Sequence, residues 1–335
     1  MIRATRLGLG AGLVISVVAI SLLALALGPY PLSASALMQG LLRLPGDDEA
    51  AVAEQIVWQV RLPRLAAALM VGAALAAAGA AYQALFRNPL VSPDILGVSA
   101  GAGLGAVFGI FLSLPVLGIQ MMAFVGGLGA VALVGLVAGL VRRGDRTLVL
   151  VLTGIVVGAL AGAATSLVKV LADPYDQLPA ITFWLLGSLA AVMPADIWPA
   201  IPAVVLGLVA LTLLRWRINV LGMGDEEARA LGIEAGRIRA GTIIAATLIT
   251  ASVTAIAGVV GWVGLVIPHI ARMLVGPGFG RLLPVCCLIG AGYLVVVDTL
   301  ARTIAQTEVP LGILTAVIGA PFFIALLARG RQGWS

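Results

Sequence analysis

The stretch TLVLVLTGIVVGALAGAATSLVKVL at residues 147–171 decides the class of fold. Lys169, close to its end, is its only charged residue. A helix that crosses a bilayer needs about 20 consecutive apolar residues, and this stretch exceeds that length. The sequence therefore predicts a transmembrane helix here.

The whole chain has a composition that suits lipid better than water. Of its 335 residues, 61% are hydrophobic and 10% are charged, whereas soluble domains average about 45–50% apolar and about 25% charged residues. The 42 glycines favour close helix packing inside a bilayer. The net charge of +5 does not indicate nucleic acid, because the basic residues sit at the ends of apolar segments.

Similar apolar stretches recur along residues 1–335 and predict one all-α transmembrane domain with about ten spans. The segment 179–192 is apolar but too short to cross, which predicts a re-entrant or interfacial segment. The stretch after Arg3 and Arg6 could be a cleaved signal peptide, but its length favours a retained helix. The expected spans lie at roughly 7–28, 64–86, 93–112, 116–141, 147–171, 196–214, 239–259, 262–276, 281–303 and 311–328.

The basic residues predict the orientation of these spans. With both termini in the cytoplasm, 15 of the 20 basic residues fall inside, as the positive-inside rule requires. The five on the outer side are Arg43, Arg61, Arg64, Lys169 and Arg302. The blocks 64–171 and 239–328 each hold four spans and are separated by the helix near 196–214, so they are expected to form an inverted repeat.

The segment Gly222–Gly232 is the most polar cytoplasmic part of the chain. Asp225 and Glu226 suit the first turn of a helix, and Gly232 can end that helix in a left-handed cap. A short helix across the cytoplasmic face would dock a partner, although an ordinary solvated loop fits the same composition.

Charged residues on the outer side form a second candidate binding site. Arg61 and Arg64 lie three apart and share a face if a helix has begun. Binding of an acidic partner and snorkelling to phosphate headgroups both explain them. Asp298 and Arg302 are four apart and are expected to pair on a helix.

Two further stretches suggest a conduit. Gly154, Gly158 and Gly162 share one helix face, which allows either close packing or a smooth pore wall, and the polar-tolerant face continues through Thr165 and Ser166. The prolines in FRNPLVSP at 86–93 force a tight cytoplasmic link, which is either a plain turn or a gate.

The sequence lacks the residues that several other functions require. Lys169 is the only lysine and is followed by Val170, so no phosphate-binding P-loop exists. One histidine and the adjacent Cys286 and Cys287 match no metal or catalytic pattern. Charged residues are nearly absent from span centres, which argues against an ion-coupled secondary transporter, and no nucleophile pair indicates an intramembrane enzyme.

The motifs resemble one family over nearly the whole length. They are RLPR at 61–64, QALFRNPLVSPDILGVSAGAG at 83–103, DEEARALG at 225–232, GWVGLVIPHIARMLVG at 261–276 and EVPLGILTAVIGAPFF at 308–323. In this order they resemble the FecCD-type permeases, the membrane subunits of binding-protein-dependent ABC importers for iron-siderophores, haem and vitamin B12.

This resemblance implies a multi-pass protein of the bacterial inner membrane and a homodimer around a central path. The expected partners are two cytoplasmic ATPase subunits, which bind ATP and Mg, and a periplasmic substrate-binding protein. The chain itself would hold no cofactor or metal and would not be an enzyme. The substrate stays open between a metal chelate (iron-siderophore, haem or cobalamin) and molybdate or tungstate.

The resemblance also implies roles for particular residues. The segment 224–236 would hold the coupling helices that fit the ATPase, with Gly224, Asp225, Glu226, Glu227, Ala228, Arg229, Ala230, Leu231 and Gly232. Arg61, Arg64 and Arg302 would form salt bridges with acidic residues of the binding protein. Asn88, Pro89, Leu90 and Thr147 would belong to the cytoplasmic gate, and Gly154, Gly158, Gly162, Thr165 and Ser166 would line the path.

Overall fold

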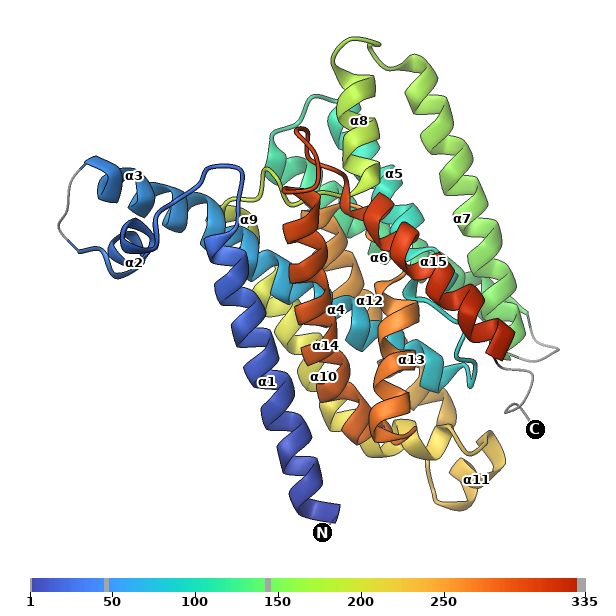
Figure 1. Ribbon diagram of the computed structural model, residues 1–335. Helices are drawn as coiled ribbons and strands as arrows, with labels where there is room; N and C mark the ends of the chain where they lie inside the picture. Colours follow the sequence, from blue (N-terminus) through green and yellow to red (C-terminus); the bar gives the residue numbers. More distant parts are fainter. Residues whose placement is uncertain (1, 45–47, 142–145, 330–335) are drawn as a thin grey trace.

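The computed structural model describes residues 2–44, 48–141 and 146–329, and within these ranges every regular element is a helix (Figure 1). Seven helices of the described part are long and apolar enough to cross a membrane, and shorter apolar helices lie between them. The elements are α1 Ile2–Ala26, α2 Ala34–Leu42, α3 Asp48–Ile56, η1 Val57–Arg61, α4 Leu62–Leu85, η2 Pro93–Leu96, α5 Val98–Phe111, α6 Val116–Leu140, α7 Arg146–Leu171, α8 Gln177–Leu186, α9 Pro194–Ile197, α10 Ile201–Leu221, α11 Asp225–Ala230, α12 Ala235–Ala257, α13 Val263–Val275, α14 Phe279–Ala301 and α15 Leu311–Arg329.

Each of the ten predicted spans coincides with a helix, so the predicted all-α membrane fold is confirmed. The first part of the predicted span 93–112 is wrong. There Pro93–Leu96 form a 3-10 turn, and Gly97, in the left-handed region at φ 77°, separates that turn from α5. The predicted short segment near 179–192 contains α8, which has 10 residues.

Helix α4 is the central element of the bundle, and 72% of its apolar window is buried. Its row of alanines and glycines lets neighbouring backbones come unusually close. A Cβ atom on Gly72 would collide with the carbonyl oxygen of Gly290 on α14. One on Gly79 would collide with that of Gly264 on α13. Small residues on α4 therefore set the distance to two helices of the other half of the chain.

Replacing Gly79 by alanine is expected to destabilise the protein by about 1–3 kcal/mol, the usual cost of overpacking. The obstacle is main chain, which cannot rotate away. The matched control is Gly129→Ala on α6, where an added Cβ meets no described atom within 4 Å. The thermal midpoint in detergent should fall for Gly79→Ala and stay level or rise for Gly129→Ala. An equal fall in both variants would contradict this packing.

The two four-helix blocks are arranged reciprocally. Helix α4, the first of one block, packs on α14, the third of the other, and α12 packs on α6 in the same way. The starts of α4 and α12 lie at opposite ends of the bundle, so these helices run in opposite directions (Figure 1). This arrangement agrees with the predicted inverted repeat.

The bundle has two distinct ends. The start of α1 and the whole of α11 lie at one, which we call the α11 end, and α3 and α8 lie at the other, which we call the outer end (Figure 1). The distribution of basic residues predicts that the α11 end faces the cytoplasm.

Candidate functional site

A short helix and the start of the next form a cap at the α11 end. Helix α11 spans Asp225–Ala230, and its first turn holds Asp225, Glu226 and Glu227, which suits the positive end of the helix dipole. Gly232 has φ 73°, so the predicted left-handed end of this helix is confirmed. Helix α12 then begins at Ala235. We call residues 224–236 the α11 cap.

The α11 cap has a buried base and an exposed outer face. Ala228 is fully buried and Ile233 is buried beside it, which fixes the short helix on the bundle. Glu226, Arg229 and Leu231 are exposed. The α11 cap therefore presents a negative, a positive and an apolar side chain on its exposed face, while its other face is anchored on the bundle.

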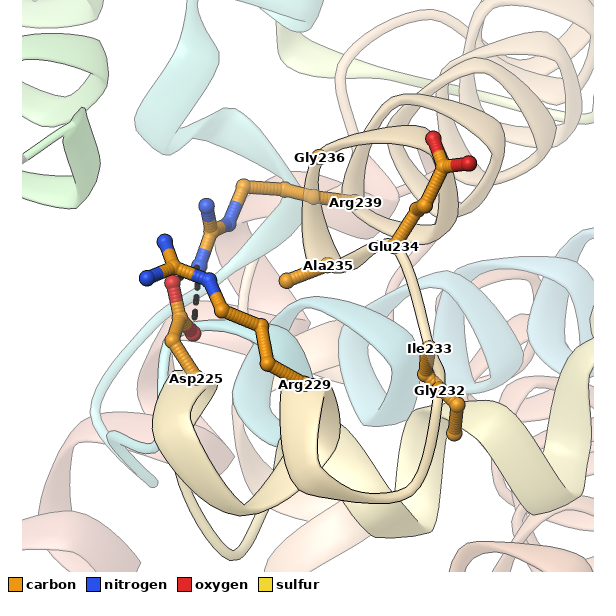
Figure 2. A pocket seen from close by; sticks show the side chains of 8 residues that line it. All are labelled: Asp225, Arg229, Gly232, Ile233, Glu234, Ala235, Gly236 and Arg239. Atoms are coloured by element: carbon orange, nitrogen blue, oxygen red, sulfur yellow. Dashed lines mark hydrogen bonds and ion pairs between the residues drawn. The ribbon is translucent and has the colours of Figure 1, made fainter.

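One ion pair ties α11 to α12. The guanidinium of Arg239 donates to both carboxylate oxygens of Asp225, at 3.0 and 3.1 Å, and the Arg239 side chain is 11% exposed. Figure 2 shows Arg229 reaching toward the same pair, while Glu234 points away from it. These side chains border a groove of about 620 Å³ between the two helices.

Removing the charge of Asp225 by Asp225→Asn is expected to loosen α11. Hydrogen bonds to charged groups contribute about 1.5–3 kcal/mol. Amide hydrogen exchange in residues 225–231 should therefore accelerate by about 10–150-fold, at about 1.4 kcal/mol per factor of ten.

The control for this experiment is Arg237→Gln. Its ion pair with Glu234 has side chains that are 81% and 64% exposed, and such surface pairs contribute little. The exchange rate should hardly change. Partial recovery in the double variant Asp225→Arg with Arg239→Asp would assign the effect to the pair, and unchanged exchange in Asp225→Asn would refute its role.

The predicted glycine ladder on α7 does not lie in one environment. Gly154 is buried, and a Cβ there would collide with the main chain of Ile95, so this glycine serves close packing. Gly158 lies near Ala100. Gly162 is exposed, and a Cβ there meets no described atom within 4 Å. Close packing therefore accounts for Gly154, and the pore-wall interpretation of Gly162 stays a prediction.

The polar residues that follow the ladder face outward from this chain. The Ser166 hydroxyl is exposed and donates to the Gly162 carbonyl at 2.9 Å, while Thr165 is half-buried. Among the exposed side chains of α7 are Leu152, Ile155 and Leu160. The role of this face in a translocation path stays a prediction.

The link between α4 and η2 is a tight turn. Arg87 has a positive φ of 50°, and the Asn88 side-chain oxygen accepts from the Leu90 amide at 2.9 Å. Pro89 is half-buried and Leu90 is 44% exposed. The following turn η2 packs against α7, whose second residue is Thr147. This geometry places η2 beside α7, and the gate function of Asn88, Pro89, Leu90 and Thr147 stays a prediction.

The arginines of the outer end belong to a buried charge network. Arg64 is 7% exposed, and its Nε donates to both Asp298 oxygens at 2.9 and 3.0 Å. Its two terminal nitrogens donate to the Glu308 carboxylate at 2.9 and 2.8 Å. The Ser188 hydroxyl adds a bond of 3.1 Å to Glu308. One guanidinium therefore joins α4, α14 and two loops.

Arg61 caps the outer end of α1. It donates to the carbonyl oxygens of Leu25, Ala26 (3.2 Å) and Tyr30 (2.6 Å). The last carbonyls of a helix lack partners within the helix, and a cation near them interacts favourably with the helix dipole. Arg61 thus fixes a helix that is otherwise mostly exposed.

Arg302 acts on the same helix end. Its guanidinium donates to the Ala24 carbonyl at 2.6 Å and lies 3.7 Å from Asp298. The predicted pairing of Asp298 with Arg302 on α14 is therefore confirmed. We call Arg61, Arg64, Arg302, Asp298 and Glu308 the arginine cluster.

The predicted salt bridges of Arg61, Arg64 and Arg302 with acidic residues of a binding protein stay a prediction, and within this chain all three side chains have another role. Arg61 and Arg64 are buried, the Arg302 side chain is 8% exposed, and all three bind groups of their own chain. Sequence reasoning missed this role because the acidic partners of Arg64 lie 234 and 244 residues away. The signal that could have found them is two carboxylates near span ends in a chain with few charges.

Metal ligation finds no support in the described ranges. No three His, Cys, Asp or Glu side chains gather there as a metal site would require. Cys286 and Cys287 are free thiols in the same part of the chain.

Comparison with known proteins agrees with this architecture. The family model of the FecCD transport family matches residues 15–329. The chain belongs to the FecCD transport family. This FecCD chain is thus a multi-pass membrane permease of the ABC importer class, as expected for a protein of the bacterial inner membrane.

The relatives of this FecCD chain are named for different substrates. It is 37% identical to the molybdate import system permease MolB of Haemophilus influenzae, over 96% of both chains. It is 43% identical to the cobalamin import system permease BtuC of Halobacterium salinarum, over 84% of this chain and 75% of BtuC. It is 40% identical to the Fe(3+) dicitrate permease FecD of Escherichia coli, over 82% and 86%.

A solved structure extends the likeness to three dimensions. The inward-facing conformation of a metal-chelate type ABC transporter superimposes with a TM-score of 0.87 at 37% identity, covering 96% of this chain and 99% of that one. The fold of this FecCD chain is therefore that of a solved chain of a metal-chelate type ABC transporter.

Proposed function

We propose that this chain forms, as a homodimer, the translocation path of an importer for metal chelates. Two cytoplasmic ATPase subunits would supply the energy, and a periplasmic binding protein would deliver an iron-siderophore, haem or cobalamin. ATP and Mg would bind the ATPase, and the permease would perform no chemistry. The α11 cap carries this proposal, because a rigidly anchored helix with exposed Glu226, Arg229 and Leu231 suits a partner that pushes on it.

The contacts of the α11 cap suggest how movement would spread. A displaced α11 pulls on α12 through Asp225 and Arg239. Helix α12 packs on α4, α6 and α10, so a shift of α12 reaches both blocks of the bundle. The turn at Asn88–Leu90 and the start of α7 at Thr147 would then change together as the gate. The ion pair and the packing contacts of α12 would together couple movement of α11 to alternating access of the path.

The surface of α7 supports a bulky cargo. Its described exposed side chains are apolar or small apart from Ser166, and its half-buried polar side chains are Thr147, Thr153, Thr165 and Lys169. Such a wall offers no strong site for a small anion and suits a passive conduit for a chelate. Molybdate or tungstate is the second candidate, because the relative named for molybdate matches over 96% of both chains.

The test is reconstitution in proteoliposomes with the importer's own ATPase and binding protein. Uptake of a ferric siderophore, haem, cobalamin and molybdate would be measured side by side. ATP-dependent uptake of one chelate, and none of molybdate, supports the proposal. Molybdate uptake alone would select the second candidate. Uptake that continues without ATP, or with an ATPase that cannot hydrolyse it, would contradict the importer class for this chain.

A further inference from the structure

The α2–α3 hairpin projects sideways from the bundle, beyond α1 (Figure 1). The two helices cross closely, because a Cβ on Gly40 would lie 2.7 Å from the Glu54 amide nitrogen. Ala36 of α2 and Ala50 and Ala53 of α3 are buried. The hairpin is therefore a packed unit whose outward surfaces are fixed.

Those outward surfaces differ in chemistry. Helix α2 has no charged residue, and its exposed Met38 (55%) and Leu42 (57%) lie four apart on one face. Helix α3 exposes Asp48, Glu49 and Gln55 together with Ala51 and Val52. One helix of the hairpin is therefore uncharged, and the other carries the acidic side chains.

The apolar helix lies at the depth where the membrane is expected to end. In Figure 1, α2 is level with the outer end of α1, and α3 lies farther out. Helix α1 exposes Val18, Leu22 and Leu23 and is long enough to span, so this surface faces lipid. Helix α2 lies at the outer edge of that surface (Figure 1).

Side chains typical of a membrane interface surround the hairpin. Tyr30 is 54% exposed and Trp58 is 37% exposed, and the indole of Trp58 donates to the Gly40 carbonyl at 3.1 Å. The Arg43 guanidinium lies 4.1 Å from the centre of the Trp58 ring. Tyrosine and tryptophan gather at headgroup depth, and arginine reaches headgroup phosphates from an apolar stem.

We propose that α2 is an interfacial helix that buries Met38 and Leu42 in the outer leaflet, with the lipid surface as its partner. Helix α3 then faces water with its carboxylates. The hairpin would fix the depth of α1, because Arg61, which holds the end of α1, is the last residue of the short helix η1 that directly follows the hairpin. This proposal does not depend on the transported substrate.

Spin labels on single cysteines test the proposal in full-length permease. Cys286→Ala and Cys287→Ala remove the native thiols, and Met38→Cys, Leu42→Cys and, as the matched control on α3, Gln55→Cys supply the labels. The protein is placed in nanodiscs of phosphatidylethanolamine and phosphatidylglycerol. Labels at 38 and 42 should collide several-fold more with oxygen, relative to a water-soluble nickel chelate, than the label at 55.

Two results would overturn the proposal. Equal nickel accessibility at 42 and 55 would place α2 in water. Labels at 38 and 42 that are open to nickel in the permease alone, and shielded only after the binding protein is added, would assign this face to a protein partner. The label at 55 reports in both cases that the hairpin is folded, since its spectrum should be that of an ordered surface helix.

Discussion

Replacing Arg64 by methionine is expected to destabilise the folded permease by about 3–5 kcal/mol, the usual effect of removing one partner from a buried ion pair. Methionine leaves two carboxylates, Asp298 and Glu308, without the guanidinium that satisfies both. Arg64→Lys should restore only part of the loss, because a single ammonium cannot bind two carboxylates with paired hydrogen bonds. The thermal midpoint in detergent and the yield of monodisperse protein measure the effect.

The matched control is Arg43→Met at the same end of the molecule. Its ion pair with Glu54 is 3.6 Å long with side chains 59% and 46% exposed, and such pairs contribute about 0–1 kcal/mol. If Arg64→Met left the thermal midpoint unchanged but weakened attachment of the binding protein, the result would refute the structural role of Arg64. It would support a docking role instead.

Reversing the charge of Arg229 is expected to abolish ATP-driven transport while the permease stays folded. Arg229 is exposed on the α11 cap, so Arg229→Glu removes no buried contact. Arginines at the centre of interfaces often contribute 2 kcal/mol or more, which corresponds to about 30-fold weaker binding. Co-purification of the ATPase subunit and uptake in proteoliposomes should both fall, with an unchanged thermal midpoint.

Arg217→Glu provides the same charge change on an exposed residue of α10. It should leave ATPase attachment and uptake near the parent level. If Arg229→Glu also retained both, the α11 cap would not be the attachment point. If both variants lost transport equally, net charge at this end of the bundle, rather than the α11 cap, would govern attachment.

Most of the spans could be predicted from the sequence because they are long apolar runs bounded by charges or proline. The same criterion failed where helices are short. Helices α2 and α3 have 9 residues each and no long apolar run, so residues 28–63 looked like a link between spans. The break before α5 was missed because Pro93 and Gly97 sit in an otherwise apolar stretch.

The two candidate sites differ in how far apart along the sequence their interacting residues lie. The α11 cap could be predicted because its helix signals lie within a dozen residues, from Asp225 to Gly232. Of the arginine cluster only the pair Asp298 and Arg302, four residues apart, could be predicted, because the other contacts depend on which helix ends meet in space. The sequence positions of Arg61 and Arg64 show two positive charges, and only the fold brings Asp298, Glu308 and the end of α1 to them.

The separation of Arg64 from its partners also has a consequence for biogenesis. Asp298 follows Arg64 by 234 residues. At synthesis rates of about 5–20 residues per second, roughly 10–50 s pass before the ribosome supplies the matching carboxylate. During that interval α4 must wait in the bilayer, with its guanidinium held at the outer headgroups. This largely buried helix is therefore among the first made, and its arginine is neutralised by one of the last segments to leave the ribosome.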